Sequence, residues 1–313
     1  MPKSSPIVYL LAILCTSIAL PAQAGVQRAF VASYGLNSNT TFSCDVTHPC
    51  RQFIAAVTVV NPGGEVVAID TAAYGTVTLT QSISLTAAPG SYAGITAFPG
   101  ATGVTIATPG VNVVLRGLTI NGQGGDYGIK MTTGTKLSIE NCVISNFNDG
   151  VGGIRSGIFV DTAAAVNVVD TLVRDNSAGI ELKGGALAII ANSKFLGNVD
   201  VGILSLSTAG MNSGADVSDT VVAGGGDGVV ANSGTSGSSK ISIIHSTISQ
   251  NTGNGIATSG TAGTASITLG YSKVTGNAHG FIQGTGGTLN SQGNNMIINN
   301  GTNTGVLTPL TSM

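Results

Sequence analysis

The stretch VVDTLVRDNSAGIELKG, residues 168–184, gathers charged side chains in a chain that has few of them. The same pattern recurs along the sequence with other residues at the charged positions. With Asp170 as the reference position, here called the anchor, the equivalent anchors are Gly117, Asn141, Asn192, Asp219, His245, Tyr271 and Asn294. Successive anchors are 22 to 29 residues apart. Because one such copy is too short to bury its own apolar side, the repeat is typical of a solenoid.

Apolar residues alternate around each anchor in a way that predicts strands. An aliphatic residue stands two positions before the anchor in every copy except the last, which has Gln292, and an apolar residue stands three positions after every anchor. A period of two is the signature of a strand. A third segment begins with glycine and an apolar residue at Gly128-Ile129, Gly157-Ile158, Gly179-Ile180, Gly202-Ile203, Gly228-Val229, Gly255-Ile256 and Gly280-Phe281. Each repeat therefore predicts three short strands, with the anchor at a bend between the first two.

A column of asparagines follows six positions after the anchor. Its members are Asn176, Asn198, Asn251, Asn277 and Asn300, and one further copy has Gly225. Asn and Gly both tolerate the left-handed backbone conformation, so we expect this column to form a left-handed turn. Stacked Asn amides can also hydrogen-bond to the coils above and below.

These features predict an all-β protein, a right-handed parallel β-helix with three strands in each of about ten coils. At the spacing of paired strands such a rod is about 45 to 50 Å long. The competing fold is a seven-bladed propeller, whose blades need about 40 residues or more. The observed repeats are too short for it.

The N-terminus reads as a secretory signal peptide over residues 1–24. It has Lys3, an apolar run and the cleavage pattern Ala22-Gln23-Ala24,. After its removal no segment is long enough to span a membrane, so we expect a secreted or periplasmic protein. With 12 basic and 14 acidic residues the chain has no basic surface, and no nucleic-acid partner is predicted,.

The mature chain divides into three predicted segments. Residues 25–64 form an N-terminal segment with a disulfide loop and a capping helix, 65–300 the β-helix, and 301–313 a C-terminal tail or closing strand. The capping helix is expected within residues 48–64, with Phe53, Ile54 and Val57 on one face and a termination signal at 61–64,.

Cys44 and Cys50 bracket a short polar loop and predict a disulfide in an exported chain,. A metal site built from Cys44, His48 and Cys50 lacks the second Cys and His pair that zinc spacing needs. The segment GGGDGVVAN, residues 224–232, resembles a calcium-binding nonapeptide but occurs once,. No metal and no cofactor are therefore predicted. Cys142 occupies a column of small residues and is expected to be buried.

Several phrases resemble a known group of proteins. CDVTHPC, RQFIAAV, NPGGEV and VVLRGLTINGQGG, followed by the repeated N-x-x-I and G-I pairs, are similar to the exported bacterial right-handed β-helix repeat proteins of the pectate lyase-like superfamily. The resemblance covers about residues 27 to 300. The resemblance implies the β-helix fold. It also implies that an enzymatic site, as in the superfamily members that act on acidic polysaccharides, would lie on the outer face of one sheet. Neither the aspartate cluster and arginine motif of the pectate lyases nor the paired aspartates of the polygalacturonases is present.

One group of side chains stands out as a candidate ligand-binding patch. In the strands that begin with Gly-Ile, the residue after the inward aliphatic points outward, which places polar and aromatic residues on neighbouring coils. The patch comprises Lys130, Arg155, Phe159, Asp161, Glu181 and Lys183. It predicts either a sugar-binding face, with Phe159 as a stacking platform, or an exposed ladder of charges that pair between coils.

Three function classes follow. The first is a carbohydrate-binding or rigid surface-presenting protein, with a polysaccharide as the partner. The second is a polysaccharide lyase, epimerase or hydrolase that uses the patch, and the third is an adhesin or structural surface protein. The sequence assigns no catalytic residue, and it leaves the oligomeric state open.

Overall fold

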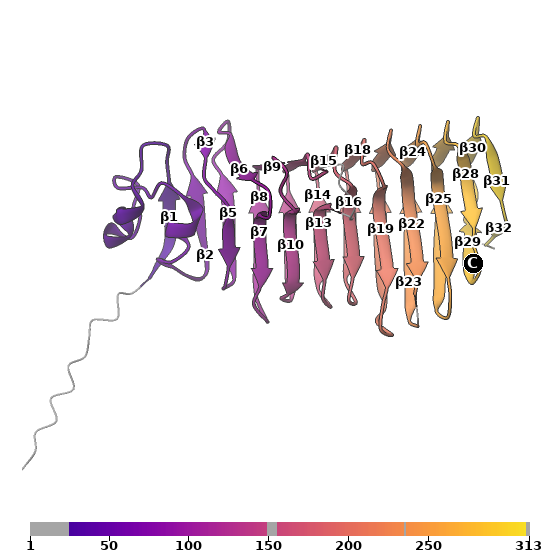
Figure 1. Cartoon of the computed structure of the whole chain (residues 1–313), viewed down its shortest axis with the longest axis horizontal. Coiled ribbons are helices and arrows are strands. Elements are labelled where there is room, and N and C mark those ends of the chain that lie inside the picture. The colour runs from indigo at the N-terminus through magenta and orange to yellow at the C-terminus, as the bar shows by residue number, and fades with distance from the viewer. Residues whose placement is uncertain (1–24, 149–154, 235, 311–313) are drawn as a thin grey trace, which may run out of the picture.

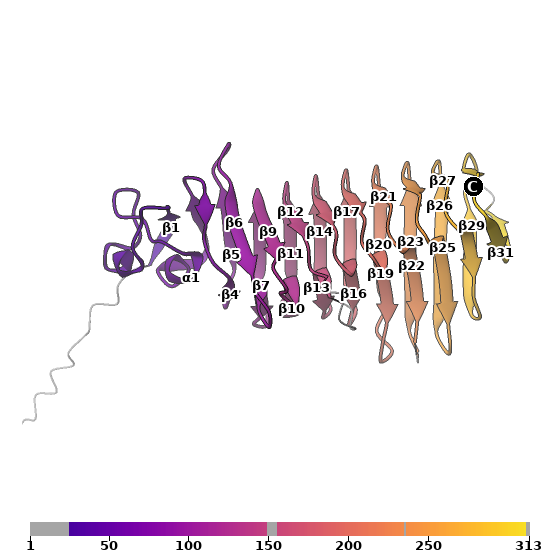
Figure 2. The same ribbon diagram turned by 45° about the horizontal axis from the view of Figure 1, so that its top comes forward.

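The computed structural model describes residues 25–148, 155–234 and 236–310. Within these residues the chain winds into an elongated parallel β-helix, with its coils stacked along the long axis (Figures 1 and 2). Three sheets, named A, B and C here, run the length of the rod, and the chain passes through them in turn. The predicted signal peptide, residues 1–24, lies outside the described residues.

Sheet A has twelve strands, and sheets B and C have ten each. The strands of sheet A are β1 (Val26–Val31), β2 (Val60–Ala68), β5 (Ile83–Ala87), β8 (Asn112–Arg116), β11 (Lys136–Glu140), β14 (Ala165–Val169), β17 (Leu187–Ala191), β20 (Ser213–Ser218), β23 (Ser238–Ile244), β26 (Thr264–Gly270), β29 (Gly287–Ser291) and β32 (Leu307–Pro309). The strands of sheet B are β3 (Ala72–Ala73), β6 (Ala93–Ala97), β9 (Leu118–Gly122), β12 (Val143–Ser145), β15 (Leu172–Arg174), β18 (Lys194–Leu196), β21 (Val221–Ala223), β24 (Thr247–Ser249), β27 (Lys273–Thr275) and β30 (Met296–Ile298). The strands of sheet C are β4 (Val77–Leu79), β7 (Thr102–Ala107), β10 (Tyr127–Thr133), β13 (Ser156–Asp161), β16 (Ala178–Lys183), β19 (Val201–Ser207), β22 (Asp227–Ser233), β25 (Asn254–Gly260), β28 (His279–Gln283) and β31 (Thr302–Thr304).

The predicted repeat is confirmed, because like positions of successive copies pair with one another. In sheet B, Ile144 pairs with Ile120 on one side and with Val173 on the other. Eight regular coils, from β5–β6–β7 to β26–β27–β28, lie between shorter ones at the two ends of the described chain, slightly fewer than the about ten expected. Paired strands extend beyond residues 65–300 on both sides, from β1 to β32.

The core is a continuous column of aliphatic side chains inside the coil. Ile139, Ile144 and Ile158, one from each sheet of a single coil, are fully buried. Burying one such side chain contributes about 1.5 to 3 kcal/mol. Because each coil presents the same three apolar columns, the stacking of coils buries surface that a single coil would leave exposed.

The anchors form a column of left-handed residues at the corner between sheets A and B. Every anchor has φ between 49° and 70°, including His245 and Tyr271. Bulky side chains rarely adopt this conformation, so the corner geometry is imposed by the pairing of the flanking strands. The bend expected at the anchor is thus confirmed, and it explains why Gly, Asn and Asp fill most copies.

The asparagine column plays a different role from the one expected. The second left-handed column stands one residue earlier, at Asn146, Asp175, Gly197, Gly224, Gln250, Gly276 and Asn299, whereas the five column asparagines have ordinary negative φ. The prediction of a left-handed Asn column was therefore wrong by one position. The turn rotates the next side chain into the interior, where Asn176 and Asn251 are buried.

The expected stacking of the amides is confirmed. Asn176 Nδ2 donates to Asn198 Oδ1 at 3.0 Å, and Asn277 Nδ2 donates to Asn300 Oδ1 at 3.0 Å. At Gly225 the ladder is interrupted, since a Cβ there would collide with the backbone carbonyl of Asn198. The position directly after the anchor carries a second ladder, which is made of buried hydroxyls. In this ladder the backbone N–H of Thr171 donates to Ser193 Oγ at 3.2 Å. These ladders satisfy backbone N–H groups that the corners leave outside the sheets.

The N-terminal end differs from the predicted cap. Helix α1 spans only Phe53–Ala56, and β2 begins at Val60, so residues 61–64 lie in an irregular part of a strand and do not end a helix. The β-branched run from Val57 to Val60 favours a strand over a helix. Phe53 is fully buried and Val57 packs against the core as expected, but Ile54 is 54% exposed, so its place on the predicted apolar face was wrong. A short 3-10 helix, η1 (Asn37–Phe42), precedes α1.

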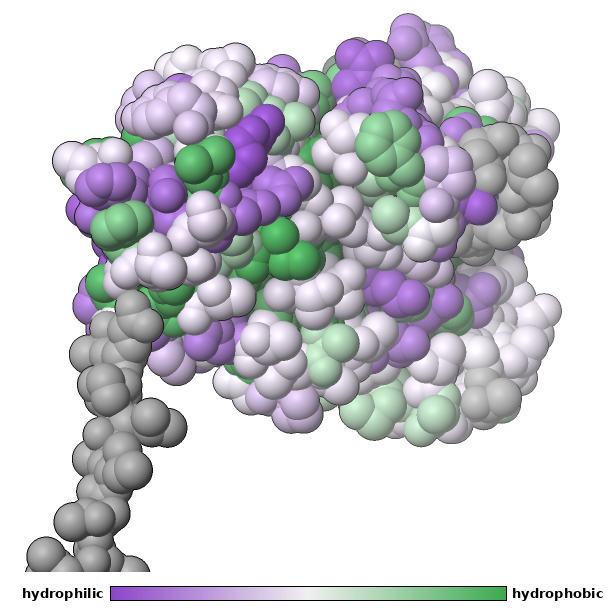
Figure 3. Space-filling model, turned by 60° about the vertical axis from the view of Figure 1, so that its left-hand side comes forward, coloured by the Kyte–Doolittle hydropathy of each residue, from purple (hydrophilic) through white to green (hydrophobic). Residues whose placement is uncertain are grey.

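The predicted disulfide between Cys44 and Cys50 is confirmed, with an S–S distance of 2.03 Å. Both cysteines are buried, while Tyr34 and Phe42 remain exposed on the same segment. Figure 3 shows that this end of the rod carries hydrophilic and hydrophobic side chains side by side.

Candidate functional site

Five of the six predicted patch residues lie on one face of three neighbouring strands. Lys130 on β10, Phe159 on β13 and Glu181 on β16 stand in register across sheet C. Asp161 and Lys183 form the next outward pair on β13 and β16. Their inward neighbours Ile158, Val160 and Leu182 are fully buried, so the alternation of the strands turns the patch outward,.

Glu181 and Lys183 form a tight ion pair on this face. Lys183 Nζ lies 2.5 Å from Glu181 Oε1, and Ser156 Oγ donates to Glu181 Oε2 at 3.2 Å. Glu181 is only 2% exposed. A buried carboxylate needs a partner for each oxygen, and these two contacts supply them. Glu181 therefore serves to fix the ammonium group of Lys183 on the surface.

Two aromatic rings lie beside this pair. The ring centroids of Tyr127 and Phe159 are 5.1 Å apart. Lys130 Nζ lies 4.6 Å from the centre of the Tyr127 ring, and Lys183 Nζ lies 5.4 Å from the centre of the Phe159 ring. Both distances are within the range of a cation–π interaction. The result is an aromatic pair flanked by two ammonium groups.

The sequence interpretation missed Tyr127, although a signal was present. Tyr127 immediately precedes Gly128-Ile129, as Ser156 precedes Gly157-Ile158. A Cβ added to Gly128 or Gly157 would meet interior side chains, so the glycine faces inward and the residue before it faces outward. The column before the glycine therefore belongs to the same outer face.

Arg155 contributes to the patch from its border. Its Nη1 lies 2.6 Å from Asp126 Oδ1 and donates to the backbone carbonyls of Gly124 and Gly125 at 3.1 and 3.2 Å. These contacts tie the turn before β10 to the start of β13. Arg155 therefore positions the strand that carries Phe159, and Asp161 is exposed at the opposite end of that strand.

Other residues singled out from the sequence are separated from the patch. Asp227 of the nonapeptide-like segment accepts hydrogen bonds from Asn254 N and Nδ2. His245 packs against the ring of Tyr271 at a corner, with centroids 5.5 Å apart. Cys142 is buried, and burial raises the pKa of its thiol to about 11,. Among the described residues no group of three or more His, Cys, Asp and Glu side chains is arranged to hold a metal ion.

The fold and this outer face define a parallel β-helix protein that carries an aromatic and cationic patch on one sheet. The chain belongs to the right-handed β-helix family, because the family model described as a right handed beta helix region matches residues 102–302. No curated protein matches the chain.

The chain is also similar to solved structures. A crystal structure of the pectate lyase Pel9A is similar with a TM-score of 0.63 at 15% identity, covering 83% of this chain and 76% of that one. The enzymatically active domain of tailspike protein 2 of bacteriophage CBA120 matches with a TM-score of 0.49 at 14% identity, covering 76% of this chain and 39% of that one. At 15% identity the likeness to the pectate lyase structure establishes the fold alone.

Among the described residues no helix combines the length and the apolar character that a membrane span requires. The Cys44–Cys50 disulfide fits a protein that works outside the cell,.

Proposed function

We propose that this protein binds a polysaccharide across the outer face of sheet C, with Tyr127 and Phe159 as the stacking surface. The observation that carries the proposal is this half-buried aromatic pair between the ammonium groups of Lys130 and Lys183. Sugar rings have apolar C–H faces that pack on aromatic rings, and their hydroxyls need charged or polar partners around the rim.

The position of the patch on the rod supports an extended ligand. Neighbouring coils repeat at the strand spacing of about 4.8 Å, so a chain of sugars that lies along the rod meets the same outward columns on each coil. Lys130 and Phe159 are successive members of one such column. The fold likeness to a pectate lyase adds support, since that neighbour acts on a polysaccharide.

The contacts of Glu181 favour binding over catalysis. A general base needs an oxygen within reach of the substrate, whereas Glu181 is almost fully buried and each of its oxygens already contacts a side chain of the protein,. Lys183 is a donor held in place, which suits recognition of hydroxyl or carboxylate groups. The alternative, a lyase, epimerase or hydrolase, requires this pair to separate when substrate binds.

The test is a binding measurement on a panel of neutral and acidic polysaccharides, with product analysis on the same samples. Tyr127→Ala and Phe159→Ala should each weaken retention at least tenfold. The matched control is Tyr271→Ala, which removes a ring of an exposed aromatic contact with His245 that lies away from the patch. Retention without products supports a binding module, and release of products supports the enzyme. Equal binding by all three variants, or no binding by the native chain, rejects the proposal.

We also propose that residues 1–24 direct export and are removed. The Ala22-Gln23-Ala24 pattern and the disulfide support this proposal. N-terminal sequencing of the mature protein should begin at Gly25. A mature chain that retains Met1 would contradict it.

A further inference from the structure

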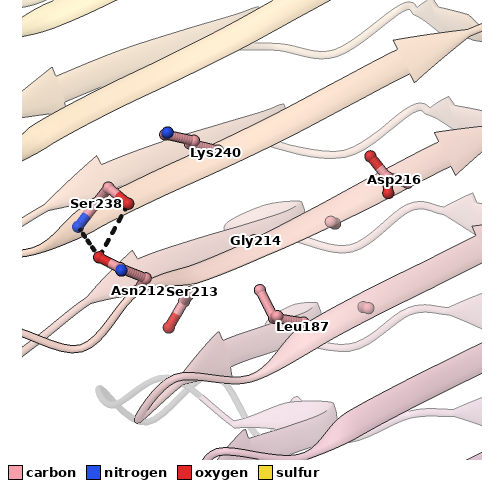
Figure 4. Close-up of a pocket in the computed structure, with 9 residues that line it drawn as sticks. Leu187, Asn212, Ser213, Gly214, Asp216, Ser238 and Lys240 are labelled. Carbon is pink, nitrogen blue, oxygen red and sulfur yellow. Dashed lines mark hydrogen bonds between the residues drawn. The ribbon is translucent and has the colours of Figure 1, made fainter.

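A groove on sheet A lies away from the patch on sheet C. It has a volume of about 350 Å³ and lies over β17, β20 and β23 (Figure 4). Leu187, Gly214 and Lys240 stand in register across these strands, and a Cβ on Gly214 would meet the backbone carbonyl oxygen of Lys240 at 2.5 Å. Asp216 follows two residues along β20, at the other side of the groove.

The apolar residues beside the groove are not required by the repeat. Leu187 and Ile189 point outward and are 59% and 55% exposed. The equivalent outward positions on the neighbouring coils hold Ala165, Asn167, Gly214 and Asp216. Leu187 and Ile189 therefore form an apolar surface that a second molecule can cover,.

The two charges at the groove have no partners of their own. Within the part of the chain that the structure describes, neither Asp216 nor Lys240 takes part in an ion pair or a side-chain hydrogen bond. Elsewhere in this charge-poor chain the exposed Arg116 and Arg174 are each paired with a carboxylate. A negative and a positive charge of this kind, placed on either side of an apolar centre, can complement a copy of themselves.

We propose that this face of sheet A is a two-fold symmetric contact between two copies of the chain. Paired strands are about 4.8 Å apart, and alternate residues along a strand are about 6.6 Å apart. A line can be drawn in the plane of the sheet that passes beside Leu187 and Gly214. With these spacings Asp216 and Lys240 stand on opposite sides of that line. A two-fold axis along that line brings Asp216 of one copy opposite Lys240 of the second copy, and the reverse contact follows by symmetry.

The same axis brings apolar side chains together. It places Leu187 of one copy close to Leu187 of the second, with Gly214 leaving room for both. The rods then cross, so the contact is confined to a few strands and the dimer is expected to be weak. The contact lies on a different sheet from the proposed polysaccharide-binding patch and does not depend on it.

The experiment is sedimentation of the full chain from roughly 10 µM to about 1 mM, which spans the dissociation constants of weak protein contacts. The native chain should pass from monomer to dimer, and 0.5 M salt should weaken the dimer because exposed charge pairs are screened. Asp216→Lys alone and Lys240→Asp alone should each weaken dimerisation at least tenfold. The double variant with both changes exchanges the charges and should restore it to within about threefold of the native chain.

Control variants place the same charge changes elsewhere. Asp200→Lys and Lys273→Asp lie outside the groove and should leave dimerisation unchanged. If a charge reversal does not fold by circular dichroism, Asp216→Asn and Lys240→Gln carry the same test with a smaller effect. A native chain that stays monomeric over the whole range, or a double variant that fails to recover, overturns the proposal.

Discussion

Asn251 donates its side-chain amide to Asn277 Oδ1 at 2.9 Å, from one coil to the next. Its own Oδ1 accepts the backbone N–H of Gly225 at 3.2 Å from the coil on the other side. A single buried amide thus joins three coils. Because its backbone is not left-handed, the value of Asn at this position lies in its hydrogen bonds.

Replacing Asn251 should therefore be costly whatever the backbone preference of the new residue. Asn251→Gly and Asn251→Val both leave buried donors and acceptors unpaired, and each should lower the free energy of unfolding by about 2 to 3 kcal/mol. Urea denaturation measures this change. A much smaller cost for Gly than for Val would show that the backbone conformation, and not the ladder, decides this position.

The anchor Asn192 should behave in the opposite way. Its φ is 50°, so Asn192→Gly should change the free energy of unfolding little, whereas Asn192→Val should lower it by about 1 to 2 kcal/mol,. The same denaturation experiment compares the two variants. If both cost the same, the left-handed conformation at the corner is not a constraint on the sequence.

Lys183 should contribute to the stability of the fold as well as to the proposed binding surface. Lys183→Met leaves the buried carboxylate of Glu181 without its cation and should lower the free energy of unfolding by about 3 kcal/mol,. The double change Lys183→Met with Glu181→Leu removes both charges and should recover most of that loss. Thermal unfolding of the two variants checks this. Failure of the double variant to recover would mean that Lys183 stabilises by packing on Phe159.

The contacts of Asp70 at the N-terminal end are expected to be sensitive to acid. Burial opposes its ionisation, but hydrogen bonds from Ser33 and Tyr74, with Arg51 nearby, hold the pKa of Asp70 below its ordinary value. The same contact, together with burial, raises the pKa of Tyr74. Because the folded state has the lower pKa, this stabilisation is complete above the ordinary Asp value of about 3.9 and is lost as the pH falls through the folded pKa.

Asp70→Asn should therefore destabilise the native protein at pH 7 and have a smaller effect below about pH 3. Urea denaturation at several pH values measures the difference between the two chains. A difference that stays constant down to low pH would show that the carboxylate charge of Asp70 does not contribute. Asp175→Asn is a suitable control, because the Asp175 contact with Arg174 is exposed,.

The candidate site was only partly predictable. The period of two located Lys130, Phe159 and Glu181 on one outward column, because strand alternation is a local property of the backbone. It could not show that Glu181 is buried, since the covering groups come from Ser156 and Lys183 on two different strands. Tyr127 was missed because the interpretation followed only the positions after the inward aliphatic residue, whereas Tyr127 immediately precedes Gly128-Ile129.

The sequence by itself determined the coil. Its apolar columns, the anchor positions and the Cys44–Cys50 pair predicted the parallel β-helix and the disulfide, because alternation, turn preference and the short spacing of the two cysteines act over short stretches of chain.

Tertiary structure alone decided which polar residues become partners. The backbone register across coils turned the asparagines inward to join successive coils and placed Lys183 against Phe159. Among the described residues it left Asp216 and Lys240 without ion-pair partners on neighbouring strands. These contacts join residues more than 20 positions apart or on different strands, and their geometry depends on how one coil is stacked on the next.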